Sequence, residues 1–141
     1  MESGKITLTI VSQERALLTA QVDSVTAPTT EGEITILPQH LPVFTQLQTG
    51  VLTYRYDKQE EQFVLSKGFL DVGPGNQVTV MVDTATHARD ISLEKAEKAI
   101  AEAHETMKSS RDQQELLLAE ASLKQALWEI KVARASKRSR I

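Results

Sequence analysis

Residues 32–42 of this chain read Gly32-Glu33-Ile34-Thr35-Ile36-Leu37-Pro38-Gln39-His40-Leu41-Pro42. Residues 33–37 alternate polar and apolar side chains, which is the period of a half-buried strand. Pro38 and Pro42 fix their own φ angles and push the residues before them into extended conformations. We therefore expect residues 39–41 to be displayed on a stiff loop. Such a loop is typical either of a binding surface or of a tight corner in a β-sandwich.

The composition indicates an aliphatic core without thiol chemistry. Of the 141 residues, 40% are hydrophobic, but only 4% are aromatic and none is cysteine. Disulfides, thiolate metal sites and cysteine nucleophiles are therefore excluded. No apolar run approaches the roughly 20 residues of a membrane-spanning helix, and the first residues lack the pattern of a signal peptide. We expect a soluble chain that faces the cytosol.

Glycine and proline divide the chain into two parts near residue 75. All six glycines and all four prolines lie at or before Gly75. Because these residues mark turns, the first part is expected to contain short strands, and residues 73–76 suit a type II turn within a hairpin. Closely spaced strands of this kind predict a sandwich or a barrel. The predicted strands are residues 6–11, 20–27, 33–37, 43–47, 51–56, 62–66, 69–72 and 77–82.

The second part of the chain has helical periodicity. Apolar residues recur at spacings of three and four in two segments, which a polar break at residues 108–111 separates. Ser92 is expected to cap the first helix and Asp112 the second. These heptad-like seams predict an antiparallel helical hairpin in which alanines let the axes approach closely. The seam residues are Leu93, Ala96, Ile100, Ala103 and Met107, then Leu116, Ala119, Leu123, Ala126, Ile130 and Ala133.

The second helical segment carries two further features that point outward. An additional apolar stripe must pack either on the sandwich or on another protein. The net charge of the chain is −3, yet residues 124–141 hold six basic side chains and one acidic one. Two interpretations of this basic end stay open: it meets an acidic partner, or it is a solvated, frayed terminus. The additional stripe consists of Leu117, Ala121, Trp128 and Val132.

The residues give little support to catalysis, metal binding or nucleic-acid binding. His40, His87 and His104 lack the spacing of metal ligands, and no glycine-rich phosphate loop is present. The basic end has no interleaved aromatic residue beyond Trp128, and the acidic remainder repels phosphate. An enzyme that used Glu33 and His40 would need a concave pocket around both, which a loop at the end of a sandwich rarely provides. Of the classes of function considered, a module that binds other proteins remains.

Two motifs of this sequence resemble the signature of the epsilon subunit of F-type ATP synthases. One spans residues 32–50 and includes Leu37-Pro38 and His40 before the second proline. The other spans residues 67–72 and continues after the turn with residues 78–85. The order of parts, strands first and helices last, matches across nearly the whole chain. Together the two motifs are a specific sign of this family, whereas either motif alone is a sign of moderate specificity.

The resemblance implies an α+β fold in two domains. Residues 1–85 would form a ten-stranded β-sandwich, and residues 86–141 an antiparallel two-helix hairpin. It further implies a non-catalytic subunit of the rotary central stalk, peripheral to the cytoplasmic face of an energy-coupling membrane. The sandwich would bind the gamma subunit and the ring of c subunits. The competing interpretation is a stand-alone adaptor built from a sandwich and a helical hairpin.

The resemblance also implies which residues meet partners. In the family, the positions of Glu33 and His40 lie at or near the face that meets the polar loops of the ring, and Gln39 lies between them on the loop. The resemblance further implies that the hairpin inhibits ATP hydrolysis by extending along gamma, where its last helix would face acidic loops of the catalytic alpha and beta subunits. The basic residues expected to meet those loops are Lys131, Arg134, Lys137 and Arg138.

The ATP-sensing motif of some bacterial members is degenerate in this sequence. Those members bind ATP through Ile/Leu-Asp-x-x-Arg-Ala at the start of the first helix, supported by arginines on the second. Here serine replaces the aspartate and lysine replaces the arginine, whose planar fork it does not reproduce. Gln125 and Glu129 stand at the supporting positions, and Glu129 has the wrong charge for phosphate. We expect no cofactor, with ATP binding absent or weak. The aligned motif residues are Ile91, Ser92, Lys95 and Ala96.

Overall fold

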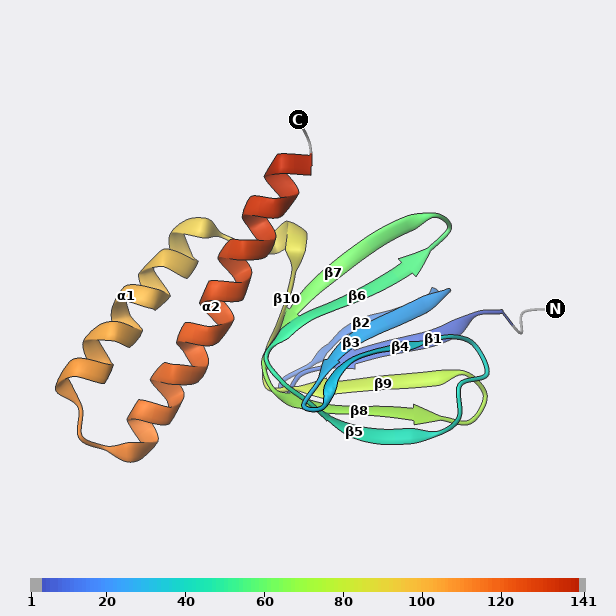
Figure 1. Cartoon of the computed structure of the whole chain (residues 1–141), viewed down its shortest axis with the longest axis horizontal. Coiled ribbons are helices and arrows are strands. Elements are labelled where there is room, and N and C mark those ends of the chain that lie inside the picture. Colours follow the sequence, from blue (N-terminus) through green and yellow to red (C-terminus); the bar gives the residue numbers. More distant parts are fainter. Residues whose placement is uncertain (1–3, 140–141) are drawn as a thin grey trace. The chain divides into compact units, whose positions relative to one another are not determined.

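The computed structural model describes residues 4–139, with side chains described for residues 4–135. Contacts between residues divide the chain into two compact units, with the division after Ala85. The described chain contains ten strands followed by two long helices, which confirms the predicted α+β fold (Figure 1). We describe each unit by itself.

The first unit is a β-sandwich built from one continuous hydrogen-bonded sheet (Figure 1). The order of strands in the sheet is β10-β7-β6-β3-β5-β8-β9-β1-β2, and β4 pairs with β3. β1 and β9 run parallel, although they lie at opposite ends of the sandwich sequence. The strands are β1 (Ile6–Val11), β2 (Ala16–Val22), β3 (Ser24–Thr29), β4 (Gly32–Ile36), β5 (Val43–Leu47), β6 (Gly50–Tyr56), β7 (Gln59–Leu65), β8 (Gly68–Gly73), β9 (Gln77–Val82) and β10 (Ala85–His87).

Alternate side chains of the strands point into a shared aliphatic core. In β1, every second side chain is buried and those between them are half-exposed, which is the period that a strand imposes. Each buried aliphatic side chain stabilises the fold by ~1.5–3 kcal/mol relative to an exposed one. The largest side chains that are completely buried in this core are Ile6, Leu8, Ile10, Ile36, Leu47, Leu52, Leu65 and Leu70.

The prediction of a single strand over residues 20–27 is wrong. The structure has two strands there, and the break between them is at Asp23. Val22 and Val25 are both fully buried although they are three positions apart. A single strand, whose period is two, cannot place both side chains on one face. The chain therefore changes course at Asp23, so that β2 pairs with β1 whereas β3 pairs with β6.

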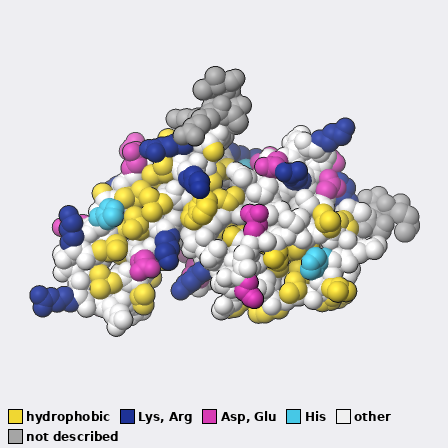
Figure 2. All heavy atoms as spheres, viewed as in Figure 1, with side chains coloured by type: hydrophobic (Ala, Val, Ile, Leu, Met, Phe, Trp, Pro, Cys, Tyr) yellow, Lys and Arg dark blue, Asp and Glu magenta, His cyan; other side chains and the backbone are white. Residues whose placement is uncertain are grey.

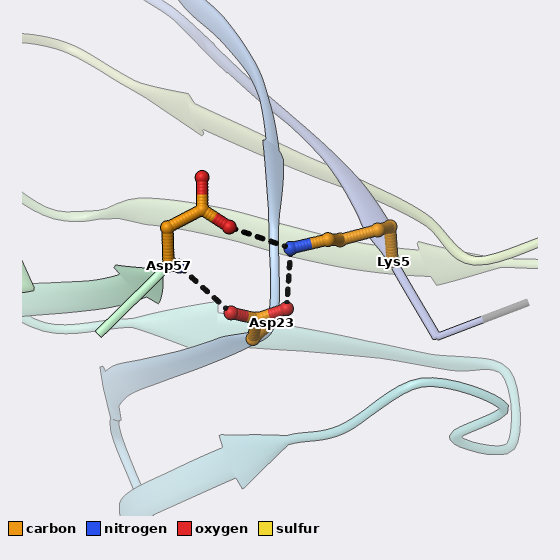
Figure 3. Close-up of polar contacts among 3 residues, drawn as sticks. All are labelled: Lys5, Asp23 and Asp57. Atoms are coloured by element: carbon orange, nitrogen blue, oxygen red, sulfur yellow. Dashed lines mark hydrogen bonds and ion pairs between the residues drawn. The ribbon is translucent and has the colours of Figure 1, made fainter. Parts of the chain in front are cut away.

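Asp23 joins this break to two other segments of the sandwich (Figure 3). Lys5 Nζ donates to its Oδ1 at 2.7 Å, and the backbone N–H of Asp57 donates to its Oδ2 at 3.1 Å. These hydrogen bonds, chiefly the one from Lys5, lower the pKa of Asp23 below its ordinary value of 3.8. The stabilisation is therefore fully present above pH 3.8 and is lost as the pH falls through the lower pKa of the folded state.

The second unit is the predicted antiparallel helical hairpin. It begins at Thr86, within β10, and contains the short helix η1 (Ala88–Asp90), α1 (Leu93–Ser109) and α2 (Gln113–Ser139). The Ser92 side chain accepts a hydrogen bond from the Lys95 N–H at 3.2 Å and caps α1. Asp112 Oδ1 accepts one from the Gln114 N–H at 2.9 Å at the start of α2. Both predicted caps are confirmed.

The two helices meet mainly through small side chains. Five of the eleven predicted seam residues are buried and five are half-buried, whereas Met107, at the end of the seam on α1, is 41% exposed. Because alanine buries little apolar area, this interface is weaker per residue than the core of the sandwich. The buried residues of the seam are Ala96, Ala103, Ala119, Ala126 and Ile130.

Candidate functional site

A pair of stacked aromatic rings lies exposed on the outer face of the sandwich. The ring centroids of Phe44 on β5 and Phe69 on β8 are 5.4 Å apart, with an angle of 15° between the ring planes. The side chains nevertheless remain 62% and 40% exposed. Phe44 lies opposite Asp71 and Phe69 opposite Gln46, so the rings meet diagonally across the two strands.

The apolar surface continues from these rings across two more strands. Met81 on β9 lies opposite Phe69, and Val11 on β1 lies opposite Met81. We call Phe44, Phe69, Met81 and Val11 the aromatic row. Figure 2 shows hydrophobic side chains gathered on the surface of the sandwich beside a histidine. Exposed aromatic side chains in a continuous apolar row are typical of a protein interface.

The loop of residues 37–42, which we call the proline loop, leads directly into β5, the strand that carries Phe44 of the aromatic row. The His40 N–H donates to the Leu37 carbonyl at 3.1 Å, and Gln39 has a φ of 69°. With Pro38 at the second position, this is the arrangement of a type II turn. Leu37 and Leu41 are 58% and 79% exposed, so the loop adds two apolar side chains to the surface.

Asn76 connects the loop to the sheet. Its side-chain Oδ1 accepts a hydrogen bond from the Gln39 N–H at 2.6 Å. Its backbone carbonyl accepts one from the Thr7 N–H at 2.8 Å, where β1 begins. The loop is therefore held both by its own turn and by the connection between β8 and β9.

The predicted ring-contact residues are all exposed. Glu33 lies on β4 opposite Pro28 of β3. Gln39 and His40 lie together in the turn, where His40 Nδ1 donates to the Leu41 carbonyl at 2.7 Å. The aromatic row and Asn76 were missed by sequence reasoning, because both depend on which strands pair. The one sign in the sequence was a pair of phenylalanines in otherwise aliphatic strands.

The predicted basic contacts lie toward the end of α2. Lys131 and Arg134 are exposed. Lys131 Nζ lies 4.8 Å from the centroid of the Trp128 ring, which is a cation–π contact. Lys137 and Arg138 lie within α2, but outside the residues whose side chains are described.

The degenerate ATP motif and its supporting positions make contacts within the second unit. Ile91 follows η1, the Ser92 hydroxyl caps α1, and Ala96 is buried against α2. Glu129 Oε2 accepts hydrogen bonds from Thr86 Oγ1 at 3.1 Å and from Gln125 Nε2 at 3.3 Å. A carboxylate held at this position repels a phosphate rather than binding it.

Three further properties bear on function. A groove of about 460 Å³ lies between α1 and α2, with Lys98, Glu102 and Glu115 around a floor that includes Ala103. Among the residues with described side chains, no group of three acidic or histidine residues is placed to hold a metal ion. Within the described part of the chain, the helices are too short or too polar to cross a membrane.

The sequence matches known proteins over most of its length. The family model for the ATP synthase delta/epsilon chain, β-sandwich domain, matches residues 5–88. The ATP synthase epsilon chain of Herpetosiphon aurantiacus is 39% identical over 129 residues, which cover 92% of this chain and 94% of that protein. The epsilon chain of Moorella thermoacetica is 37% identical over 133 residues, which cover 94% and 98% respectively.

Two solved structures have the same fold. A chain in the OSCP/F1/c-ring assembly of the Euglena gracilis mitochondrial ATP synthase matches with a TM-score of 0.72 and 29% identity, covering 89% of this chain and 79% of that one. A chain in the central stalk and c-ring of the Tetrahymena thermophila enzyme matches with a TM-score of 0.63. Its identity of 17% supports the fold alone, over 94% of this chain and 99% of that one.

Proposed function

Because this chain belongs to the delta/epsilon family of ATP synthase subunits, we propose that it is a rotor subunit of the central stalk. As a family member it is a subunit of an ATP synthase and not an enzyme on its own. Its proposed task is to couple proton flow through the membrane ring to ATP synthesis. The observation that carries this proposal is the exposed aromatic row next to a fixed loop on a well-packed sandwich.

The aromatic row is the proposed contact with the gamma subunit. Stacked rings of Phe44 and Phe69 offer a large apolar area that is already ordered before binding. Buried aromatic anchors supply much of the energy of protein interfaces. A sandwich with a continuous aliphatic core also resists deformation, which a part that transmits torque requires.

Glu33, Gln39 and His40 are the proposed contacts with the polar loops of the c subunits. All three are exposed, and the latter two lie on a turn that is closed by its own hydrogen bond and joined to Asn76 through Gln39. A carboxylate at Glu33 can pair with a basic ring loop, and partial desolvation would strengthen that pair. Membrane association is then indirect, through the complex, on the cytoplasmic face of a bacterial inner membrane or the stromal face of a thylakoid.

Replacing Glu33 with alanine is expected to weaken binding of the chain to the ring about fivefold, the effect of losing one ion pair of ~1 kcal/mol. The number of protons pumped per ATP hydrolysed by the reconstituted complex should fall with it. Glu31→Ala removes an equal charge from the preceding turn and serves as the control. An unchanged pumping ratio together with unchanged ring affinity would contradict a ring contact at Glu33.

The helical hairpin is the proposed inhibitor of ATP hydrolysis. Its alanine-rich interface is weak enough to open, which an element with two arrangements requires. In the extended state, Lys131 and Arg134 on α2 meet acidic loops of the alpha and beta subunits. Lys137 and Arg138, further along the same helix, are assigned the same role.

Truncation after His87, which keeps β10, is expected to raise ATP hydrolysis by the assembled complex severalfold without preventing assembly. The full-length variant Lys131→Glu/Arg134→Glu should also raise ATP hydrolysis, because it reverses the charges that meet acidic loops. Lys124→Glu reverses a charge elsewhere on α2 and should leave hydrolysis unchanged. Equal hydrolysis rates for the truncated and intact chains would refute the inhibitory role.

We further propose that ATP binds this chain weakly or not at all. Glu129 holds a carboxylate where an arginine is needed, and Gln125 and Thr86 already donate to it. Calorimetry of the isolated chain is expected to give a dissociation constant of about 1 mM or more, a binding free energy weaker than ~4 kcal/mol. A micromolar constant would overturn this. Binding should strengthen in a variant that carries Ser92→Asp, Lys95→Arg, Gln125→Arg and Glu129→Arg.

A further inference from the structure

We propose that Asn76 is a positioning residue that holds the loop of residues 37–42 in its ring-binding conformation. The proposal rests on the function assigned above to that loop. Asn76 itself belongs to the connection between β8 and β9, which is 37 positions away from Gln39 in the sequence. It therefore acts on the loop through a contact that only the fold creates.

The backbone of Gln39 shows why the loop needs an external anchor. Its φ of 69° lies in the left-handed region, which is unfavourable for a residue with a Cβ atom. The position directly after proline in a type II turn favours glycine for this reason. The loop thus adopts a conformation that Gln39 does not prefer, and other interactions must retain it.

Asn76 Oδ1 supplies such an interaction. It accepts the Gln39 N–H at 2.6 Å, which is a short distance for a hydrogen bond from a backbone amide. This bond engages the very residue whose backbone is left-handed. The bond between His40 N–H and the Leu37 carbonyl closes the turn, and the bond to Asn76 joins Gln39 to the β8–β9 connection.

Asn76 is itself held in place by the structure around it. Its φ of 60° is one that asparagine tolerates better than most residues, and it follows Gly75 with a φ of 72°. Its carbonyl accepts the Thr7 N–H at 2.8 Å, which joins it to the first strand. Hydrogen bonds therefore link β1 to Asn76 and Asn76 to Gln39. A binding loop held in this way loses less conformational freedom when it meets its partner.

Two substitutions distinguish the role of Asn76 Oδ1 as a hydrogen-bond acceptor from the need for a positive φ at position 76. Asn76→Gly keeps a residue that accepts a positive φ but removes Oδ1. Asn76→Asp keeps both an oxygen acceptor and tolerance of that φ. Amide hydrogen exchange of Gln39, measured by NMR on the full chain, should be about tenfold faster in Asn76→Gly and near the original rate in Asn76→Asp. Exchange of the Leu8 amide in the core reports whether the sandwich stays folded.

Binding to complexes depleted of this chain gives the functional readout. Asn76→Gly should weaken binding about fivefold, and Asn76→Asp should restore it. Unchanged Gln39 exchange in Asn76→Gly would overturn the proposal, as would faster exchange with unchanged binding. Glu33→Ala measured in parallel distinguishes the two failures. If it still weakens binding, only the role of Asn76 is wrong; if it does not, the proposed ring contact is wrong as well.

Discussion

Replacing Gly68 with alanine is expected to destabilise the sandwich by about 3 kcal/mol, near the upper end of overpacking effects. A Cβ atom at this position would lie 2.0 Å from the carbonyl oxygen of Met81 and 2.8 Å from the Cα of Val82. Both are backbone atoms of β9, which pairs directly with β8. They cannot rotate away as a side chain would, so the paired strands would have to separate.

Gly73, at the other end of the same strand, is the matched control. A Cβ there would meet its nearest heavy atom, the Gln77 carbonyl oxygen, at 3.9 Å. Gly73→Ala should therefore change the free energy of unfolding by no more than about 0.5 kcal/mol. Urea denaturation at equal m-values compares the two variants directly. If Gly68→Ala were as stable as Gly73→Ala, the close approach of β8 and β9 at this point would be wrong.

The double variant Phe44→Ala/Phe69→Ala is expected to weaken binding to the gamma subunit by a factor on the order of 1,000. Central aromatic residues of an interface commonly contribute ~2 kcal/mol each, and two such losses account for this factor. Both side chains are substantially exposed in the chain by itself. Their removal should therefore affect binding much more than folding.

The affinity is best measured by titrating the labelled chain onto complexes that lack it, with thermal unfolding of each variant recorded alongside. Arg55→Ala is a suitable control, because it removes a side chain that is 67% exposed on β6, outside the aromatic row. Equal affinities for the double variant and Arg55→Ala would show that gamma binds elsewhere on the sandwich.

Local patterns in the sequence predicted those elements whose periodicity is uninterrupted. The strands at residues 43–47 and 77–82 have the predicted bounds. The helix cap at Ser92 was also predicted, because it follows from the chemistry of neighbouring residues. The short strand β10 was not predicted individually, since three residues carry too little pattern.

The errors arose where the structure depends on distant residues. The spacing of three between Val22 and Val25 was a local sign that the strand breaks, but the anchors of that break, Lys5 and Asp57, come from elsewhere in the chain. The stacking of Phe44 on Phe69 requires that β5 pair with β8, which periodicity cannot reveal. The exposed loop was predicted from its prolines, but its anchor at Asn76 was not.

The most direct test of the proposed contact with gamma is photocrosslinking within the assembled ATP synthase. The chain contains no cysteine, so a single Gln46→Cys substitution can carry a thiol-linked photoreactive group. Gln46 lies opposite Phe69 on the outer face, beside the aromatic row. Gln59→Cys, at the start of β7, serves as the control. We predict an adduct with the gamma subunit from position 46 and none from position 59. An adduct with gamma from position 59 but not from position 46 would contradict the account.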